Sequence, residues 1–373
     1  MKLVYVCKNS WWDKRKARKT LLPYAFSELE NTNVMLVNAA IPFYKCRNHP
    51  RLWVHPTTKM KVFTPRRLLP LQRFSQVRKI NQFLRWKGIL KQIERCFFEK
   101  LSTHTIFILS DPEDIYLSQY IRDEGYRCYF DWTEDWGQYK QAAGEYSQTK
   151  VDVDHIFLYV DGVVVVSEEL KAKAQDLGLD CLHLPNAVSD QFIQQLEGCE
   201  EKEDPMEGIP EPRAIHVGSY NPAWIYWDWL IHAANKNPSI SFCMIGGGGE
   251  DDMPAELPSN IYLLGRIQYE DIPDYLCHSQ VCMLLYKDKA TSAGDPTKLY
   301  EYLATGLPII ASPHPRCLEF QAYIYVARDA EAFNNQLHLA LEEHGDEQEK
   351  RVLESKKHTW NIRAKQLLSW LKG

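Results

Sequence analysis

Short apolar runs alternate with amphipathic stretches along most of the chain. Residues 3–7 form the first apolar run, residues 16–30 follow with helical spacing, and residues 34–39 form a second run. A strand, a helix and a strand in this order are typical of a parallel sheet. Further strands are predicted at residues 105–110, 128–132 and 162–167. The pattern therefore predicts a doubly wound α/β domain in the first half of the chain.

A second α/β series follows an acidic, proline-rich stretch at residues 197–213, which we expect to be a linker. Its strands are predicted at residues 214–219, 241–247, 260–265, 281–286, 308–312 and 323–327. We expect one Rossmann-like domain over residues 1–196, another over 214–345, and a final helix over 346–373 that packs across both. A chain of 373 residues is long enough for two such domains, which would face each other across a cleft.

The overall composition is that of a soluble globular protein. Hydrophobic residues make up 45% of the chain and charged residues 25%. No apolar run approaches the roughly 18 residues that a membrane span needs. The apolar run at the N-terminus is too short for a signal peptide, and the basic cluster follows this run instead of preceding it. We therefore expect a cytoplasmic protein.

Cysteine and histidine spacing gives no support for a metal site. The ten cysteines contain no C-x-x-C pair, and the twelve histidines show no H-E-x-x-H pattern. Cys7, Cys243 and Cys282 lie within predicted buried strands. We expect the cysteines to be reduced thiols that act as small hydrophobic residues, in place of a disulfide framework or metal ligands.

The net charge is only −5, but its distribution is uneven. Residues 31–93 contain no Asp or Glu and many Lys and Arg. Within the basic segment 45–95, apolar residues recur over 71–95 at helical steps, as in a helix that lies on an anionic membrane. A core-packed helix with a solvated basic face is the alternative. Nucleic-acid binding is disfavoured because the sequence contains no recognition module and no interleaved aromatic pattern.

Residues 295–311, DPTKLYEYLATGLPIIA, combine a helix start with two charged side chains. Thr297 is the expected cap of this helix, and Gly306 is its expected stop. The free amides and the positive end of a helix start suit a phosphate. Lys298 would neutralise a diphosphate, and Glu301, one turn on, would accept hydrogen bonds from the vicinal hydroxyls of a ribose. An ordinary surface pair of Lys and Glu is the alternative.

Three acids follow an expected strand in FDWTEDW, residues 130–136. A doubly wound fold places its ligand crevice at the carboxyl ends of its strands. Crowded carboxyl groups raise the pKa of at least one of them when they are enclosed, which suits a general base. We rank Asp135 first as the catalytic base, Asp131 second and Glu134 third. The alternative is that these acids cap the following helix.

The string K-x-x-E-Y-L-A-x-G-x-P resembles the donor-site signature of the GT-B glycosyltransferases. Residues 184–192 and 260–276 are similar to further segments of this superfamily. Residues 11–29 resemble the opening of a bacterial subgroup that builds surface polysaccharides. The resemblance implies an N-terminal acceptor domain and a C-terminal donor domain. Many retaining members carry a second Glu eight residues before the first, where this chain has Ala293, so the stereochemical outcome stays open.

The candidate donor-binding residues lie in several segments of the second domain. His314 and Arg316, after the strand at 308–312, could reach the donor phosphates or face solvent. The full donor-binding set consists of Lys298, Glu301, Gly265, Arg266, Gly218, Thr297 and Tyr302.

The function that this resemblance implies is the transfer of a hexosyl or glycuronosyl group, without a metal ion. The donor would be a nucleoside-diphosphate sugar, with no further cofactor. The acceptor would be a hydroxyl of a glycan or a lipid-linked oligosaccharide in cell-surface polysaccharide biosynthesis. We expect the enzyme to be cytoplasmic and peripheral on the inner membrane leaflet. The alternatives are a nucleotide-sugar epimerase of the same fold and a non-catalytic relative that binds sugar or nucleic acid.

Overall fold

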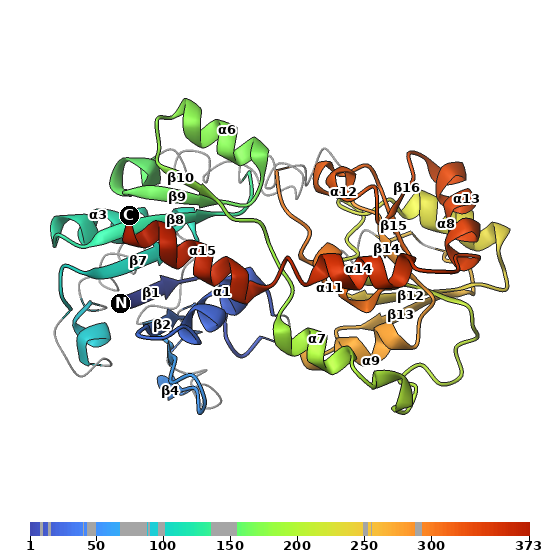
Figure 1. Cartoon of the computed structure of the whole chain (residues 1–373), viewed down its shortest axis with the longest axis horizontal. Coiled ribbons are helices and arrows are strands. Elements are labelled where there is room, and N and C mark those ends of the chain that lie inside the picture. The colour runs from blue at the N-terminus through green and yellow to red at the C-terminus, as the bar shows by residue number, and fades with distance from the viewer. Residues whose placement is uncertain are drawn as a thin grey trace. The chain divides into compact units, whose positions relative to one another are not determined.

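The computed structural model divides the chain into two compact α/β units (Figure 1). Unit 1 contains the described residues up to Pro185 together with residues 363–373, and unit 2 contains residues 186–362. The structure describes residues 1–7, 10–13, 16–39, 41–42, 50–67, 88, 90–95, 101–135, 155–248, 253–254, 256–287 and 293–373.

Unit 1 is built on a sheet with the strand order β10-β9-β8-β7-β1-β2-β5-β4, in which β4 and β5 are antiparallel and the other neighbours are parallel. These strands are β1 (Lys2–Val6), β2 (Asn33–Val37), β4 (Leu52–Val54), β5 (Lys61–Phe63), β7 (Thr105–Leu109), β8 (Arg127–Trp132), β9 (Gly162–Val165) and β10 (Cys181–His183). The central strands are buried along almost their whole length, which explains their continuous apolar runs.

The helices of unit 1 connect these parallel strands. They are α1 (Arg18–Ser27), α3 (Ile115–Asp123) and α6 (Glu168–Asp176). Unit 1 also contains a small sheet of β3 (Ile41–Pro42) and β6 (Arg66–Arg67) and the short 3-10 turns η2 (Pro112–Asp114) and η3 (Phe157–Tyr159). The expected doubly wound domain is therefore confirmed.

Unit 2 contains an all-parallel sheet with the order β13-β12-β11-β14-β15-β16. Its strands are β11 (Arg213–Gly218), β12 (Ser241–Gly246), β13 (Ile261–Gly265), β14 (Val281–Leu284), β15 (Ile309–Ala311) and β16 (Tyr325–Val326). Its core includes Trp227, Leu230, Phe242, Met283 and Phe333. This second doubly wound sheet agrees with the fold class expected from the sequence.

The helices of unit 2 follow the strands in alternation. They are α7 (Asp190–Leu196), α8 (Trp227–Lys236), α9 (Ile272–Cys277), α11 (Thr297–Thr305), α12 (Pro315–Glu319), α13 (Ala330–Leu341) and α14 (Glu347–Ser355), with the short 3-10 turns η4 (Cys199–Glu201) and η6 (Tyr269–Asp271). The last helix is α15 (Trp360–Lys372), and its residues from Arg363 onward group with unit 1.

The boundaries differ from the expected ones at two places. Unit 2 begins at Asn186, so the acidic stretch 197–213 lies inside this unit and is not the connection between units. The expected single helix over 346–373 is interrupted between α14 and α15. There the chain turns over residues 356–358, and Thr359 forms an isolated bridge with Val188, whose amide donates to the His358 carbonyl and whose carbonyl accepts from the Trp360 amide.

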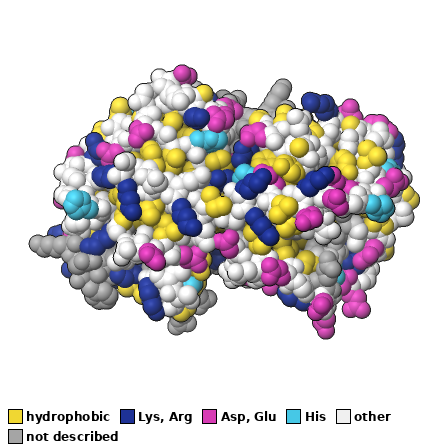
Figure 2. Space-filling view, viewed as in Figure 1, with side chains coloured by type: hydrophobic (Ala, Val, Ile, Leu, Met, Phe, Trp, Pro, Cys, Tyr) yellow, Lys and Arg dark blue, Asp and Glu magenta, His cyan; other side chains and the backbone are white. Residues whose placement is uncertain are grey.

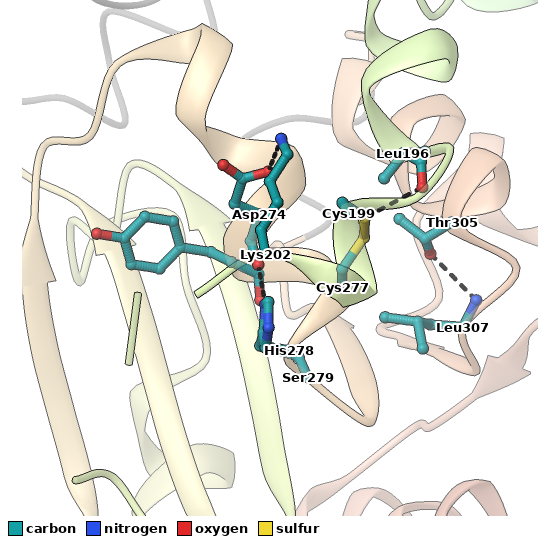
Figure 3. Close-up of a disulfide and its surroundings, with 10 residues drawn as sticks. Leu196, Cys199, Lys202, Asp274, Cys277, His278, Ser279, Thr305 and Leu307 are labelled. Atoms are coloured by element: carbon teal, nitrogen blue, oxygen red, sulfur yellow. Dashed lines mark hydrogen bonds and ion pairs between the residues drawn. A yellow bond between two sulfur atoms is a disulfide. The ribbon is translucent and has the colours of Figure 1, made fainter. Parts of the chain in front are cut away.

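The expectation of reduced cysteines was wrong for one pair. Cys199 and Cys277 form a disulfide that joins η4 to the end of α9 (Figure 3). Their Cα atoms lie 6.2 Å apart, within the range that a disulfide can span. The residues are 78 positions apart in the chain, so their proximity depends on the tertiary fold and could not be read from cysteine spacing. Cys243 and Cys282 are buried free thiols, as expected, and Cys7 is buried as well.

The basic segment 45–95 is described at residues 50–67, 88 and 90–95. The rest of the expected amphipathic helix over 71–95 lies outside the described residues. Leu90 and Ile93, at its end, are buried, so this part packs into the core of the unit. On the face shown in Figure 2, Lys and Arg side chains are interspersed with Asp and Glu and with hydrophobic groups, as on most protein surfaces.

Candidate functional site

Helix α11 begins and ends at residues whose backbone is suited to those positions. Pro296 precedes the helix with extended dihedral angles, and the helix begins at Thr297 without a side-chain cap, so the expected cap at Thr297 does not form. Gly306 ends the helix in the left-handed region, with φ of 75°. The first amides of α11 therefore lack a capping side chain and present the positive end of the helix dipole.

Lys298 and Glu301 form an ion pair on the first turns of α11. The Lys298 side chain is 12% exposed and that of Glu301 is fully buried. Oε2 of Glu301 accepts from Lys298, whereas Oε1 accepts no hydrogen bond from the described residues. A buried carboxylate oxygen without a partner is costly, and such an atom is commonly found where a ligand binds. The alternative of a solvent-exposed surface pair is therefore not what the structure shows.

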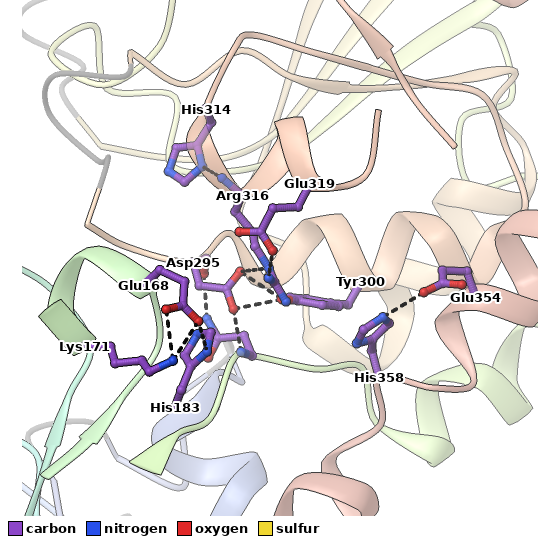
Figure 4. Close-up of polar contacts among 11 residues, drawn as sticks. Glu168, Lys171, His183, Asp295, Tyr300, His314, Arg316, Glu319, Glu354 and His358 are labelled. Carbon is purple, nitrogen blue, oxygen red and sulfur yellow. Dashed lines mark hydrogen bonds and ion pairs between the residues drawn. The ribbon is translucent and has the colours of Figure 1, made fainter. Parts of the chain in front are cut away.

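A second polar cluster fixes the segment just before α11 (Figure 4). Asp295 accepts from the Asn186 amide and from the Tyr300 hydroxyl, whose oxygen in turn accepts from Arg316 Nε at 2.8 Å. The Asn186 side chain donates to the Asp295 carbonyl at 2.6 Å. Asp295, the acid nearest to position 293, is thus fully engaged in holding the N-terminal end of the helix. Arg316 is bound to Tyr300 and Glu319 in this structure.

Glycines shape the carboxyl ends of the strands in unit 2. Gly246 has φ of 146°, and a Cβ at this position would lie 1.6 Å from the carbonyl oxygen of Gly218. β11 and β12 can therefore end side by side only with a glycine at position 246. Gly265 ends β13 with φ of 70° and open space around its Cα, and Arg266 after it is exposed.

Tyr302 lies inside the core of unit 2. Its side chain is fully buried, and its hydroxyl accepts from the Val217 amide at 2.7 Å. This contact ties α11 to β11, next to Gly218. The geometry favours a role in holding α11 in place over direct contact with a ligand.

His216 is a buried histidine of β11, near the end of that strand. Its Nδ1 lies 3.2 Å from the Met283 carbonyl and its Nε2 lies 3.3 Å from the Ser219 carbonyl. Burial lowers its pKa from 6.5 to about 4, and the nearby Lys298 charge acts in the same direction. The imidazole is therefore neutral at pH 7.

The three candidate acids of unit 1 lie in different surroundings. Asp131, in β8, is 1% exposed and accepts from Arg18 Nε at 2.9 Å and from the Tyr5 hydroxyl. Arg18, the first residue of α1, also donates to the Leu184 carbonyl at 2.8 Å. Burial and the Asp131 carboxylate raise the pKa of Tyr5 well above its ordinary value. This buried cluster holds α1 against the end of β8.

Asp135 and Glu134 are both partly exposed, beyond the end of β8. Asp135 forms an ion pair with Lys173 at 2.8 Å, with 23% of its side chain exposed. The Glu134 carbonyl accepts from the Trp132 indole at 2.9 Å. The Asp135 carboxylate is thus accessible to solvent and also has a charged partner. All three acids stay candidates for the catalytic base.

Sequence reasoning missed two features of these sites. It did not identify Arg18 as the partner of Asp131, because the two residues are far apart in the chain. It also gave Tyr269 no role, although the ring of this residue lies against Lys298 with the ammonium 5.5 Å from its centroid. Cation and aromatic residue come from separate elements, so no local pattern could pair them.

The described part of the chain contains neither a metal-binding cluster nor a membrane-spanning helix. No group of three or more His, Cys, Asp or Glu there could hold a metal ion. None of its helices is both long enough and apolar enough to cross a membrane.

Comparison with known proteins supports the class that the motifs suggest. Residues 227–369 match the family model described as glycosyl transferase-like. No curated protein matches the chain in sequence. Sucrose-phosphate synthase from Thermosynechococcus elongatus superposes with a TM-score of 0.71 at 13% identity, covering 100% of this chain and 98% of that one.

Two further solved structures have the same architecture. HepE of Anabaena, in complex with UDP and glucose, gives a TM-score of 0.69 at 13% identity and covers 100% of both chains. An α,α-trehalose-phosphate synthase (UDP-forming) from Burkholderia xenovorans, in complex with glucose-6-phosphate, gives 0.70 at 12% identity, again with 100% of both chains covered. The chain therefore has the GT-B fold.

The chain thus has the GT-B fold, and its residues 227–369 match the glycosyl transferase-like family model. The fold implied by the resemblance of K-x-x-E-Y-L-A-x-G-x-P is confirmed, and the match of residues 227–369 supports the expected transferase class.

Proposed function

We propose that this protein transfers a sugar from a nucleoside-diphosphate sugar to a hydroxyl of a glycan or lipid-linked oligosaccharide. The observation that carries the proposal is the buried Glu301 carboxylate at the start of α11, with one oxygen paired to Lys298 and the other without a partner. Vicinal ribose hydroxyls would supply the missing hydrogen bonds to Oε1. A bound ribose would thus relieve the cost of burying this oxygen.

Lys298 has a separate role in this proposal. Negative charge grows on the diphosphate as the bond to the sugar breaks, so a cation placed there stabilises the transition state more than the ground state. The Lys298 ammonium is held by Glu301 and lies against the Tyr269 ring. The uncapped amides at the start of α11 would add to the same stabilisation.

The acceptor hydroxyl must lose a proton as it attacks the anomeric carbon. We assign this proton transfer to Asp135, because this carboxylate is partly exposed, whereas Asp131 is buried against Arg18 and Tyr5. A base must reach the proton of the substrate within hydrogen-bond distance, and a fully engaged buried carboxylate is poorly suited to that. Glu134, which is also partly exposed, is the second candidate.

The nucleotide of the donor is best sought among uridine compounds first. Solved structures of similar fold carry UDP, glucose and UDP-glucose in the case of HepE. The experiment is a thermal-shift screen with UDP, GDP, ADP and dTDP sugars, since a ligand that binds only the folded state raises its melting temperature. We expect one nucleotide to stand out. If none of the four raises the melting temperature, the proposed donor site is wrong.

We further propose that the acceptor belongs to cell-surface polysaccharide biosynthesis and that the enzyme acts peripherally on the inner membrane leaflet. Support comes from the basic segment 45–95 and from the resemblance of residues 11–29 to bacterial polysaccharide enzymes. Because Leu90 and Ile93 are buried, membrane contact would fall to the cationic side chains of the segment. Flotation with anionic and with neutral liposomes tests this, and equal binding to both would remove the membrane role.

A further inference from the structure

Tyr269 is buried between α11, which carries Lys298 and Glu301, and α7. Its ring lies under the Lys298 ammonium, with Nζ 5.5 Å from the centroid, and it packs against Phe192 of α7 at 5.6 Å between centroids. Its hydroxyl lies 3.4 Å from Ser189 Oγ. Burial and the negative charge of Glu301 raise the pKa of Tyr269 well above its ordinary value, so the phenol is neutral. The Tyr269 side chain therefore contacts Lys298 and lies within electrostatic range of Glu301.

The position of Tyr269 is fixed at both ends of the α7 and α9 pair. Near one end, the Ser189 side chain caps α7 by accepting a hydrogen bond from the Phe192 amide. The Phe192 ring packs on the ring of Tyr269, the first residue of η6, and η6 leads directly into α9. At the other end, the disulfide between Cys199 and Cys277 joins the segment after α7 to the last residue of α9 (Figure 3). The two helices are therefore closed into one covalent unit that carries Tyr269.

A second link lies beside the disulfide. Lys202, just after η4, forms an ion pair with Asp274 of α9 at 2.6 Å. Since helix α7 also contacts α11, the helix that bears the donor pair, this covalent unit is packed directly on the candidate site. Tyr269 is itself a buried core residue, with 7% of its surface exposed.

We infer that Tyr269 is a positioning residue for donor binding, which acts through Lys298. This inference rests on the proposed donor site. Glu301 and the aromatic face of Tyr269 share the ammonium of Lys298. When a donor engages Glu301, the ring face continues to hold the ammonium and directs it toward the diphosphate, because a π face attracts a cation without competing for hydrogen bonds.

Titration calorimetry with UDP, GDP, ADP and dTDP tests this inference in the full-length protein. The variants are Tyr269→Leu, Tyr269→Phe and, as a matched control, Tyr275→Leu within α9. For whichever diphosphate binds wild type most tightly, we expect Tyr269→Leu to weaken affinity about tenfold, as expected from a partly buried cation–π contact. Tyr269→Phe keeps the ring and should stay within about twofold, as should the control.

A double-mutant cycle separates positioning from structural damage. In a Lys298→Ala background, Tyr269→Leu should produce no further loss of affinity if it acts through Lys298, whereas independent effects would add. If Tyr269→Leu does not fold, Tyr269→Met, which fills the space without a π face, is tested with the same expectations. An affinity loss in Tyr269→Leu no larger than in Tyr275→Leu overturns the inference, as does a full further loss in the Lys298→Ala background.

The two levels of the proposal fail in different ways. If wild type binds none of the four diphosphates, the proposed donor site fails and the role of Tyr269 fails with it. If wild type binds one of them and Lys298→Ala weakens this binding while Tyr269→Leu does not, only the role of Tyr269 is overturned.

Discussion

Arg18 holds Asp131 through two bonds from its Nε, at 2.9 Å and 3.0 Å to the two carboxylate oxygens, deep inside unit 1. The pair joins the first residue of α1 to the end of β8, in a place where neither charge is exposed to water. Removing one partner of such a pair leaves the other charge buried and uncompensated. We therefore expect Asp131 to contribute to stability, whereas Asp135 of the same segment is the proposed catalytic base.

Asp131→Asn should lower stability strongly. The amide keeps the shape of the side chain but leaves the Arg18 charge unpaired, at a cost of about 3–5 kcal/mol. Urea unfolding of the variant and of wild type measures this difference, with Asp161→Asn, a partly exposed acid of the same unit, as control. A variant as stable as wild type would show that the buried pair is not important for folding.

Asp135→Asn should lower turnover and leave folding nearly intact. Loss of a general base costs about 100-fold to 10,000-fold in rate. Since Asp135 is partly exposed and its ion pair with Lys173 is worth little, stability should change by less than about 1 kcal/mol. Steady-state transfer assays with Lys173→Ala as control measure the effect. Normal turnover in Asp135→Asn would move the base assignment to Glu134 or Asp131.

His216 should make the stability of the protein depend on pH. Burial lowers its folded-state pKa to about 4 from 6.5, so the unfolded chain takes up a proton first as the pH falls. The stability contributed by the neutral ring is therefore complete above pH 6.5 and is lost between pH 6.5 and 4, by about 3 kcal/mol in total. Denaturation curves at pH 7, 5.5 and 4 should show a shallower loss for His216→Gln than for wild type. Parallel losses would contradict this.

Reduction of the Cys199–Cys277 disulfide should destabilise unit 2. A cross-link that closes a loop of this length contributes about 2–4 kcal/mol by restricting the unfolded chain. Reductant should therefore lower the melting temperature of wild type and leave the double variant Cys199→Ser with Cys277→Ser unaffected. Alkylation and mass spectrometry follow the two thiols directly. If both react without reductant, the disulfide does not form in solution.

Local patterns were enough to predict the sheets and the helix that carries Lys298 and Glu301. The apolar runs that form β1, β7 and β14 are continuous because parallel strands are buried on both faces. Such a run consists of neighbouring residues and can therefore be recognised in the sequence. The start of α11 could be placed because Pro296 and Gly306 limit the backbone near both ends.

Relationships between distant residues could not be predicted in this way. The disulfide, the Arg18–Asp131 pair and the contact of Tyr269 with Lys298 each join elements that only the completed fold brings together. The expected cap at Thr297 failed for a local reason. Pro296 already has the extended conformation of a residue that precedes a helix, so the helix starts at Thr297 itself.

The proposed recognition of ribose by Glu301 is tested most directly by comparing two ligands in two proteins. Titration calorimetry measures the affinity of UDP and of 2′,3′-dideoxy-UDP, or of the corresponding pair for whichever nucleotide the screen selects, in wild type and in Glu301→Ala. We expect wild type to prefer the hydroxylated ligand by about tenfold or more and Glu301→Ala to lose this preference. An equal preference for the hydroxylated ligand in both proteins would contradict the placement of the ribose at the start of α11.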